Sequence, residues 1–149
     1  MSNGPDDPTT AAARAKAGDR WPDAEEAFEA GLAMRRSMFG AGGADDQIVG
    51  ADEFSWPMQD YVTRWCFGET WTRDELSPAI RSMLTLSMLV AYGRPQEIKV
   101  HVQGAVANGV TPEQIREVML HAMIYCGVPR AVEGFRVAAD TLREMGAIS

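Results

Sequence analysis

A helix that is apolar on nearly every side constrains the fold of this chain more than any other feature. Ser77 and Pro78 form a helix start, with serine as the cap and proline in the first turn, and the helix continues to Tyr92. From Met83 onward its residues are almost all apolar, and a helix of this kind must be surrounded by protein. In a chain of 149 residues, we expect other helices and a second subunit to cover it.

The remaining residues show helical periodicity and no alternating strand pattern, so the predicted fold class is all-α. Glycines and prolines divide the chain into about six helices, predicted at residues 21–39, 55–67, 78–92, 95–108, 111–126 and 129–145. A loop is predicted at residues 40–53, where glycine and aspartate are frequent. Residues 1–20 lack large apolar side chains and are expected to form a flexible tail, which leaves residues 21–149 as a single domain.

The first two helices each have a predicted buried face. In the first helix this face consists of Ala24, Phe28, Leu32 and Met38. In the second it consists of Met58, Tyr61, Val62, Trp65 and Cys66. Arg35 and Arg36 lie in the last turn of the first helix, where cations interact favourably with the helix dipole.

The composition argues against several classes of partner. A formal net charge of −7 disfavours nucleic acid and anionic membrane surfaces. No run approaches the roughly 18 apolar residues of a membrane span, and the N-terminus has no apolar signal segment. The two cysteines, Cys66 and Cys126, are too few for a disulfide framework, so we expect a reduced, cytoplasmic setting.

The helix that begins at Pro95 carries a carboxylate and an imidazole one turn apart, Glu97 and His101. Together with Arg94 they flank the apolar stripe of this helix, at positions between the core and the solvent. Such a pair can have shifted pKa values, which a site for proton transfer requires. On spacing alone, an ordinary ion pair worth roughly a few tenths of a kcal/mol is the more common alternative.

Arg81 stands in the first turn of the apolar helix, where a cation opposes the helix dipole. We therefore expect a carboxylate partner, which is either a protein Asp or Glu or a bound substrate. Trp71 is more typical of a core residue than of a ligand platform, and His121 of an ordinary helix-face histidine. No metal-ligand spacing or nucleotide-binding glycine loop is present, so no metal site is predicted.

The run WCFGETWTRDELSPAIRSMLTLSMLVAYGRPQEIKVHVQGAVANGVTPEQIREVMLHAMIYCGVPRA resembles the carboxymuconolactone decarboxylase family, and EAGLAMRRSMFG resembles its N-terminal helix. The resemblance covers roughly residues 23–147 and rests on RS-apolar-LTL, E-x3-H, NGVTPEQIREV and YCGVP together. It implies an alkylhydroperoxidase D-like orthogonal helical bundle in a ring-like homo-oligomer, a trimer or a hexamer. The implied reaction is the cofactor-free conversion of 4-carboxymuconolactone to 3-oxoadipate enol-lactone and CO2 in protocatechuate breakdown.

This resemblance, with the residue types, leads us to predict roles in the site. His101 would donate a proton or stabilise an oxyanion, and Glu97 would orient or charge His101. The arginines would bind the carboxylates of a small anionic lactone, mainly through Arg81 and more weakly through Arg94 and Arg73. The site would be closed to water by an apolar wall of Trp71, Leu84 and Tyr92.

Two other interpretations stay open. The redox branch of the superfamily carries Cys-x-x-Cys-x-x-x-His, and here Arg94 and Glu97 occupy the two cysteine positions, which disfavours a thiol oxidoreductase. A non-catalytic binding or assembly protein with the same fold is the third interpretation. Phe67, where the family's decarboxylases are expected to have tryptophan, and His121, where glutamine is usual, leave the substrate open.

Overall fold

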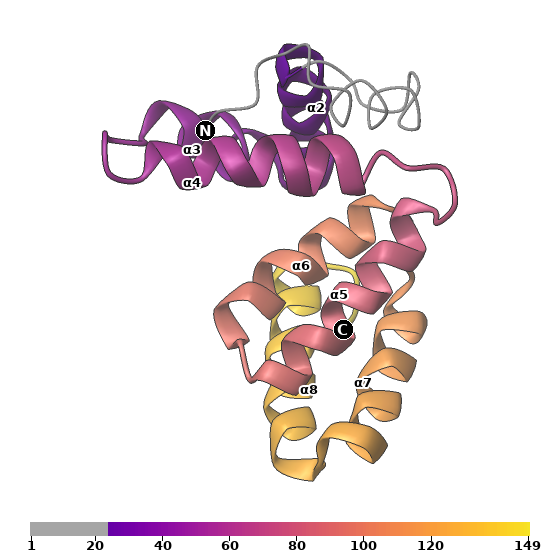
Figure 1. Cartoon of the computed structure of the whole chain (residues 1–149). Coiled ribbons are helices and arrows are strands. Elements are labelled where there is room, and N and C mark those ends of the chain that lie inside the picture. Colours follow the sequence, from indigo (N-terminus) through magenta and orange to yellow (C-terminus); the bar gives the residue numbers. More distant parts are fainter. Residues whose placement is uncertain (1–23) are drawn as a thin grey trace, which may run out of the picture.

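The computed structural model describes residues 24–149, and within this range the chain is helical without any strand (Figure 1). An N-terminal layer lies across one end of a C-terminal bundle. The layer consists of α2 (Ala24–Gly43), α3 (Asp45–Val49), α4 (Trp56–Tyr61) and the π-helix η2 (Val62–Thr70). The bundle consists of α5 (Pro78–Tyr92), α6 (Pro95–Ala107), α7 (Pro112–Cys126) and α8 (Val128–Glu144). None of these helices is both long and apolar enough to cross a membrane.

Helix α5 lies at the centre of the bundle and begins as predicted, with the hydroxyl of Ser77 accepting a hydrogen bond from the amide of Ile80. One face is buried against α6, α7 and α8, through Ser82, Leu86 and Val90. The rest of α5 is less covered than its sequence predicts. Its exposed side chains include Ile80, Leu84, Met88 and Tyr92.

The N-terminal layer depends on a close crossing between α2 and η2. A Cβ atom on Gly31 would lie 1.9 Å from the carbonyl oxygen of Thr63, and one on Gly68 would lie 2.0 Å from that of Ala27. Only glycine lets the two backbones approach this closely. The crossing therefore explains why small residues, and not the predicted apolar side chains, face the partner helix.

The predicted faces of the first two helices are accordingly wrong in most positions. On α2 the buried residues are Ala27, Gly31, Arg35 and Met38, of which only Met38 was predicted. On α4 and η2 they are Gln59, Thr63, Phe67 and Gly68. Of the predicted apolar face of this second helix, Val62 packs against a core cluster, whereas the other four residues are exposed, Tyr61 to 67%.

Two predicted boundaries also change. The expected loop at residues 40–53 contains the short helix α3, and the second helix continues past Gly68 to Thr70 as a π-helix. Gly40 has a φ of 65° and marks a kink, which agrees with a first helix that stops there. The predicted tail at residues 1–20 and the first residues of the first helix lie outside the described range.

Arg35 is the main polar residue inside the N-terminal layer. It is only 4% exposed, and burial lowers the pKa of its guanidinium. Its nitrogens donate to the carbonyl of Gly43, to Oε1 of Gln59 at 3.0 Å and to Oγ1 of Thr63 at 2.7 Å. Arg35 thus links α2 to α4 and η2. The sequence predicted only an interaction of Arg35 with the helix dipole and did not predict its burial. Its neighbour Arg36 is exposed and pairs with Asp45.

We predict that Gly68→Ala destabilises the fold by about 1–3 kcal/mol or more, because the new methyl group would overlap the backbone of α2. Chemical denaturation monitored by circular dichroism measures the change. Gly42→Ala is the matched control, since its Cβ would meet nothing closer than Oδ2 of Asp46 at 3.9 Å. Equal stability of the two variants would contradict the close crossing.

Candidate functional site

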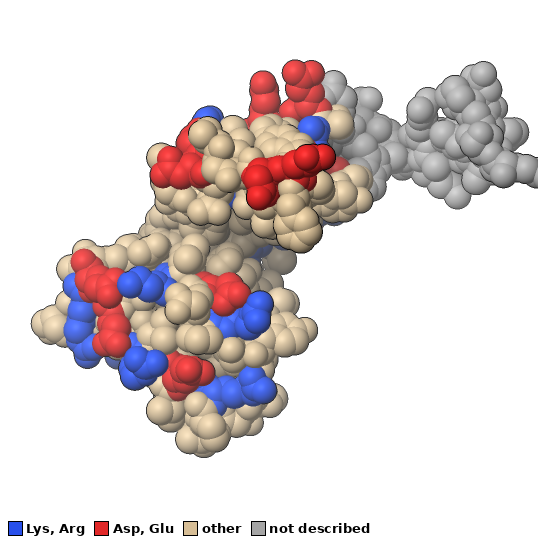
Figure 2. Space-filling view, turned by 90° about the vertical axis from the view of Figure 1, so that its left-hand side faces the viewer, with Lys and Arg blue, Asp and Glu red and all other residues tan. Residues whose placement is uncertain are grey.

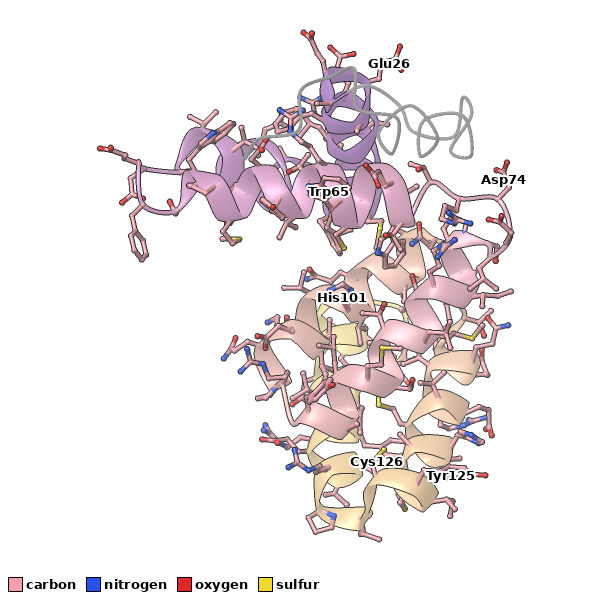
Figure 3. The ribbon with its side chains drawn as sticks, in the orientation of Figure 1. Glu26, Trp65, Asp74, His101, Tyr125 and Cys126 are labelled. Atoms are coloured by element: carbon pink, nitrogen blue, oxygen red, sulfur yellow. The ribbon has the colours of Figure 1, made fainter. Side chains whose placement is uncertain are left out.

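His101 lies where the C-terminal bundle meets the N-terminal layer, beneath the helix formed by α4 and η2 (Figure 3). The ring of Phe39, from the end of α2, meets the imidazole edge to face at 5.5 Å and meets Phe67 in the same way at 5.8 Å. Gly104, one turn after His101, makes room for Phe39, because a Cβ atom there would lie 2.6 Å from its ring. Aromatic packing thus holds His101 in a defined position between the two layers.

The imidazole of His101 is partly withdrawn from water. Burial lowers its pKa, and the charge of Glu97 raises it by a smaller amount. The imidazole is therefore uncharged at neutral pH in the free protein. Its Nδ1 atom is buried and has no hydrogen-bond partner among the described residues. A buried polar atom without a partner is unfavourable, and such atoms are common where a ligand binds.

Glu97 acts on His101 through its charge. Its carboxylate is bound by Arg94, at 3.2 Å, and both side chains are exposed. The structure thus brings the three predicted residues Arg94, Glu97 and His101 together in the first two turns of α6. It does not show the hydrogen bond by which Glu97 would orient the imidazole.

Arg81 is held by the backbone of the segment that precedes α5. Its Nη2 donates to the carbonyl oxygen of Arg73 at 3.1 Å, while the side chain of Arg73 pairs with Glu75. No described carboxylate lies within ion-pair distance of Arg81, and its Nε is buried without a hydrogen-bond partner. A bound substrate, one of the two partners expected for this cation, therefore stays a prediction.

Helices α5 and α6 place Arg81 and His101 along one line. The amide of Asn108 donates to the hydroxyl of Ser82 at 3.0 Å, which sets the two antiparallel helices in register. On a wheel of 100° per residue, Arg81 and His101 both fall on the side of their helix that borders the other helix and faces away from the bundle core. We call this line the α5–α6 seam. His101 is two turns before Asn108, so it lies roughly 10 Å along the seam from Arg81.

The remaining predicted residues are placed less favourably. Trp71 is buried in a small core and stacks on Phe67 at 5.7 Å, as expected of a core residue. Tyr92 is 76% exposed and lies roughly 16 Å along α5 from Arg81. Leu84 lines a groove between α5 and α7. The three residues do not form one wall.

A separate groove of about 760 Å³ runs between α5 and α7. It is lined mainly by apolar side chains, among them Ile80, Met83, Leu84, Leu120 and Ile124. His121 borders this groove, is exposed and packs on Tyr125 at 4.8 Å, in agreement with a helix-face histidine. Apart from Leu84, which was predicted for the apolar wall, the groove contains none of the residues predicted for the site.

The cysteines are poorly placed for thiol chemistry. Cys66 is on η2, whereas Cys126 lies at the opposite end of the bundle (Figure 3), and both are free. Burial raises the pKa of the Cys66 thiol, and this outweighs the opposing effects of Trp71 and Arg35. A raised pKa decreases the thiolate fraction that a peroxidase would need. No group of three or more potential metal ligands occurs within residues 24–149.

Sequence reasoning missed the aromatic residues that position His101. Phe39 was assigned only to the end of the first helix, and Phe67 was noted only as a departure from the family. A signal was present in the spacing of His101 and Gly104, since a glycine one turn from a functional residue often marks the close approach of another element. The sequence alone did not show which element approaches.

Comparison with known proteins identifies the family. Residues 57–140 match the profile of the carboxymuconolactone decarboxylase family, which is more than half of the chain. The chain belongs to the carboxymuconolactone decarboxylase family. It is 35% identical to the nitrosuccinic acid decarboxylase of Metarhizium robertsii over 118 residues, which is 79% of this chain and 82% of that protein. It is 28% identical to the 4-carboxymuconolactone decarboxylase of Acinetobacter baylyi over 122 residues, 82% of this chain and 91% of that protein.

Membership of the carboxymuconolactone decarboxylase family and two relatives named as decarboxylases support a carboxy-lyase. The two relatives are named for different acids, so the comparisons leave the substrate open. The site therefore has to be interpreted for what these acids have in common.

We predict that His101 makes the stability of the protein depend on pH. Its pKa is lower in the folded chain than the ordinary value of 6.5, so the unfolded chain binds more protons in this range. Stability should therefore decrease as the pH falls from about 6.5 towards the folded pKa. Thermal unfolding of the wild type and of His101→Gln between pH 5 and 8 measures the effect. If the variant loses as much stability on acidification as the wild type, the burial of His101 is contradicted.

Proposed function

We propose that this protein catalyses the cofactor-free decarboxylation of 4-carboxymuconolactone, or of a related lactone carboxylic acid, to the enol-lactone and CO2 in aromatic catabolism. The observation that carries the proposal is a pair of buried nitrogens along one seam, Nε of Arg81 and Nδ1 of His101, neither of which has a partner within residues 24–149. One belongs to a cation that binds carboxylates, and the other to a group that can move a proton.

The two acids named in the relatives share a chemical logic. Nitrosuccinic acid and 4-carboxymuconolactone each carry two carboxyl groups close together, and each contains an electron-withdrawing group. In the first, the nitro group can accept the electron pair that is left when CO2 departs. In the second, the conjugated lactone carbonyl can accept it through the double bond. Such substrates supply their own electron sink, so the protein needs to bind an anion, stabilise an oxyanion and deliver a proton.

Arg81 suits the first of these tasks. Its contact with the backbone of Arg73 fixes the guanidinium, and its Nε remains available to a ligand. A guanidinium binds a carboxylate through two parallel hydrogen bonds, and a group that is already fixed loses less entropy on binding. In a chain of net charge −7, an arginine without a counterion among the described residues would provide the attraction that a dianionic substrate needs.

His101 suits the transfer of the proton. In the free protein burial lowers its pKa, and the negative charge of a bound dianion would raise it, so the imidazole would take up a proton as the substrate binds. The bond to the departing carboxylate then breaks, and its electron pair moves to the oxygen of the electron sink. The imidazolium stabilises that oxyanion and gives its proton to carbon as the electron pair returns. Solvent restores the proton for the next cycle.

The direct test measures CO2 release from 4-carboxymuconolactone and from nitrosuccinate. We expect His101→Gln to lose about 100-fold or more in kcat, the range for removal of a general acid. His121→Gln is the matched control and should keep wild-type activity, because this histidine borders the separate groove. Near-normal turnover by His101→Gln would remove His101 from the mechanism. Binding of dicarboxylates without turnover of any lactone would favour a non-catalytic binding protein.

We also propose that the chain forms a homo-oligomer, a trimer or a hexamer, through the groove between α5 and α7. Large apolar side chains are exposed on both helices, including Leu84 and Ile124, and contiguous patches of this kind are typical of interfaces. The face seen in Figure 2 differs, because acidic and basic side chains are intermixed on the C-terminal bundle there. The residues between α6 and α8 include Lys99, which pairs with Glu144.

We predict that the double variant Leu84→Glu, Ile124→Glu folds but forms a smaller assembly than the wild type. Charges at a buried apolar contact between subunits are strongly unfavourable. Sedimentation velocity measures the mass. Lys99→Glu, on the charged surface between α6 and α8, is the control and should leave the assembly unchanged. An assembly that survives the double substitution would place the interface elsewhere.

A further inference from the structure

The hydroxyl of Thr85 differs from those of the fully buried threonines. Thr63 and Thr141 donate to the carbonyl oxygens of Gln59 and Val137, one turn earlier in their own helices, at 2.7 Å in both cases. This bond satisfies a hydroxyl that has lost contact with water. Thr85 lies in the middle of α5 and is partly buried, and its hydroxyl bonds neither to the carbonyl of Arg81 nor to any other described residue. The hydroxyl is not among the buried atoms that lack a partner, so it stays accessible to water or to a ligand.

The position of Thr85 gives this hydroxyl a context. Thr85 is one turn after Arg81 on α5, on the side that borders α6. The hydrogen bond between Asn108 and Ser82 sets the register, and it places Thr85 opposite Ala105, within one turn of His101. Along the α5–α6 seam, Thr85 therefore lies between Arg81 and His101. It is the residue of α5 that separates the anchoring cation from the imidazole.

We propose that the hydroxyl of Thr85 is a substrate-binding group that donates a hydrogen bond to the oxygen of the electron sink. The proposal rests on the proposed function, because it takes Arg81 and His101 as the two ends of the site. A substrate whose carboxylate is held by Arg81 and whose reacting carbon meets His101 places its middle over Thr85. In both acids named above, the oxygen that gains negative charge as CO2 leaves belongs to a group attached to the carbon that takes the proton, so it would lie beside His101, within one turn of Thr85.

A hydroxyl suits this position better than a charged group would. It can turn to donate to the oxygen of a carbonyl or of a nitro group, so it does not restrict the site to one electron sink. Its bond to a developing oxyanion is stronger than its bond to the neutral ground state, so it favours the transition state. Shape alone does not explain threonine here, because valine has nearly the same volume and no hydroxyl that requires a partner.

The test compares Thr85→Val with Thr85→Ser in the full-length protein, using CO2 release from both acids. We expect Thr85→Val to lose about 10- to 100-fold in kcat with a small change in KM, somewhat less than the roughly 100- to 1000-fold loss on removal of one oxyanion-hole donor. Thr85→Ser keeps the hydroxyl and should stay within about threefold of the wild type. The melting temperature of Thr85→Val should not fall, since no hydrogen bond to a described residue is removed.

Thr141→Val is the matched control, because it removes a hydroxyl that does bond within its own helix. It should lower the melting temperature and leave kcat unchanged. Thr85→Ala serves as a second apolar variant if the valine variant folds poorly. Wild-type turnover by either folded apolar variant, while His101→Gln is inactive, would overturn the role of Thr85 and leave the proposed function standing. Wild-type turnover by His101→Gln, or no turnover by the wild type, would overturn both.

Discussion

The close crossing of α2 and η2 determines where the candidate site lies. Gly31 and Gly68 let the two backbones touch, and this contact determines where the end of α2 meets the bundle. Phe39 is then placed against His101 and Gly104, and Phe67 supports Phe39 from the other side. A methyl group added at the crossing would therefore shift the imidazole through the packed rings, because protein interiors have few voids that could absorb the displacement.

The electrostatics of the site follow from this packing. Covering His101 lowers its pKa and leaves Nδ1 without a partner in the described part of the chain, while Arg81 is fixed by a backbone carbonyl and has no described carboxylate to neutralise it. Both features are unfavourable in the empty protein and become favourable when an anion binds. The acidic net charge makes this arrangement more selective, since an anionic ligand is repelled by most of the surface and attracted only locally.

The sequence predicted the helical class and most helices of the bundle, because these depend on local signals such as caps and periodicity. The roles of His101 and Arg81 stay predictions. The sequence did not predict the buried faces of α2 and of α4 with η2. Periodicity identifies an apolar stripe but not which side a partner helix takes, and here glycines decided the contact. The apolar character of Leu84 likewise did not reveal that it lines the groove between α5 and α7. Phe39 reaches His101 only through the tertiary fold, so no sequence spacing could show it.

The central claim is that an anionic ligand binds along the α5–α6 seam between Arg81 and His101. A crystal structure of the protein with an unreactive dicarboxylate such as succinate tests it most directly. The account predicts one carboxylate on the guanidinium of Arg81 and ligand oxygen within hydrogen-bond distance of His101 Nδ1. A ligand bound instead in the groove between α5 and α7, beside His121, with the seam unchanged, would contradict it.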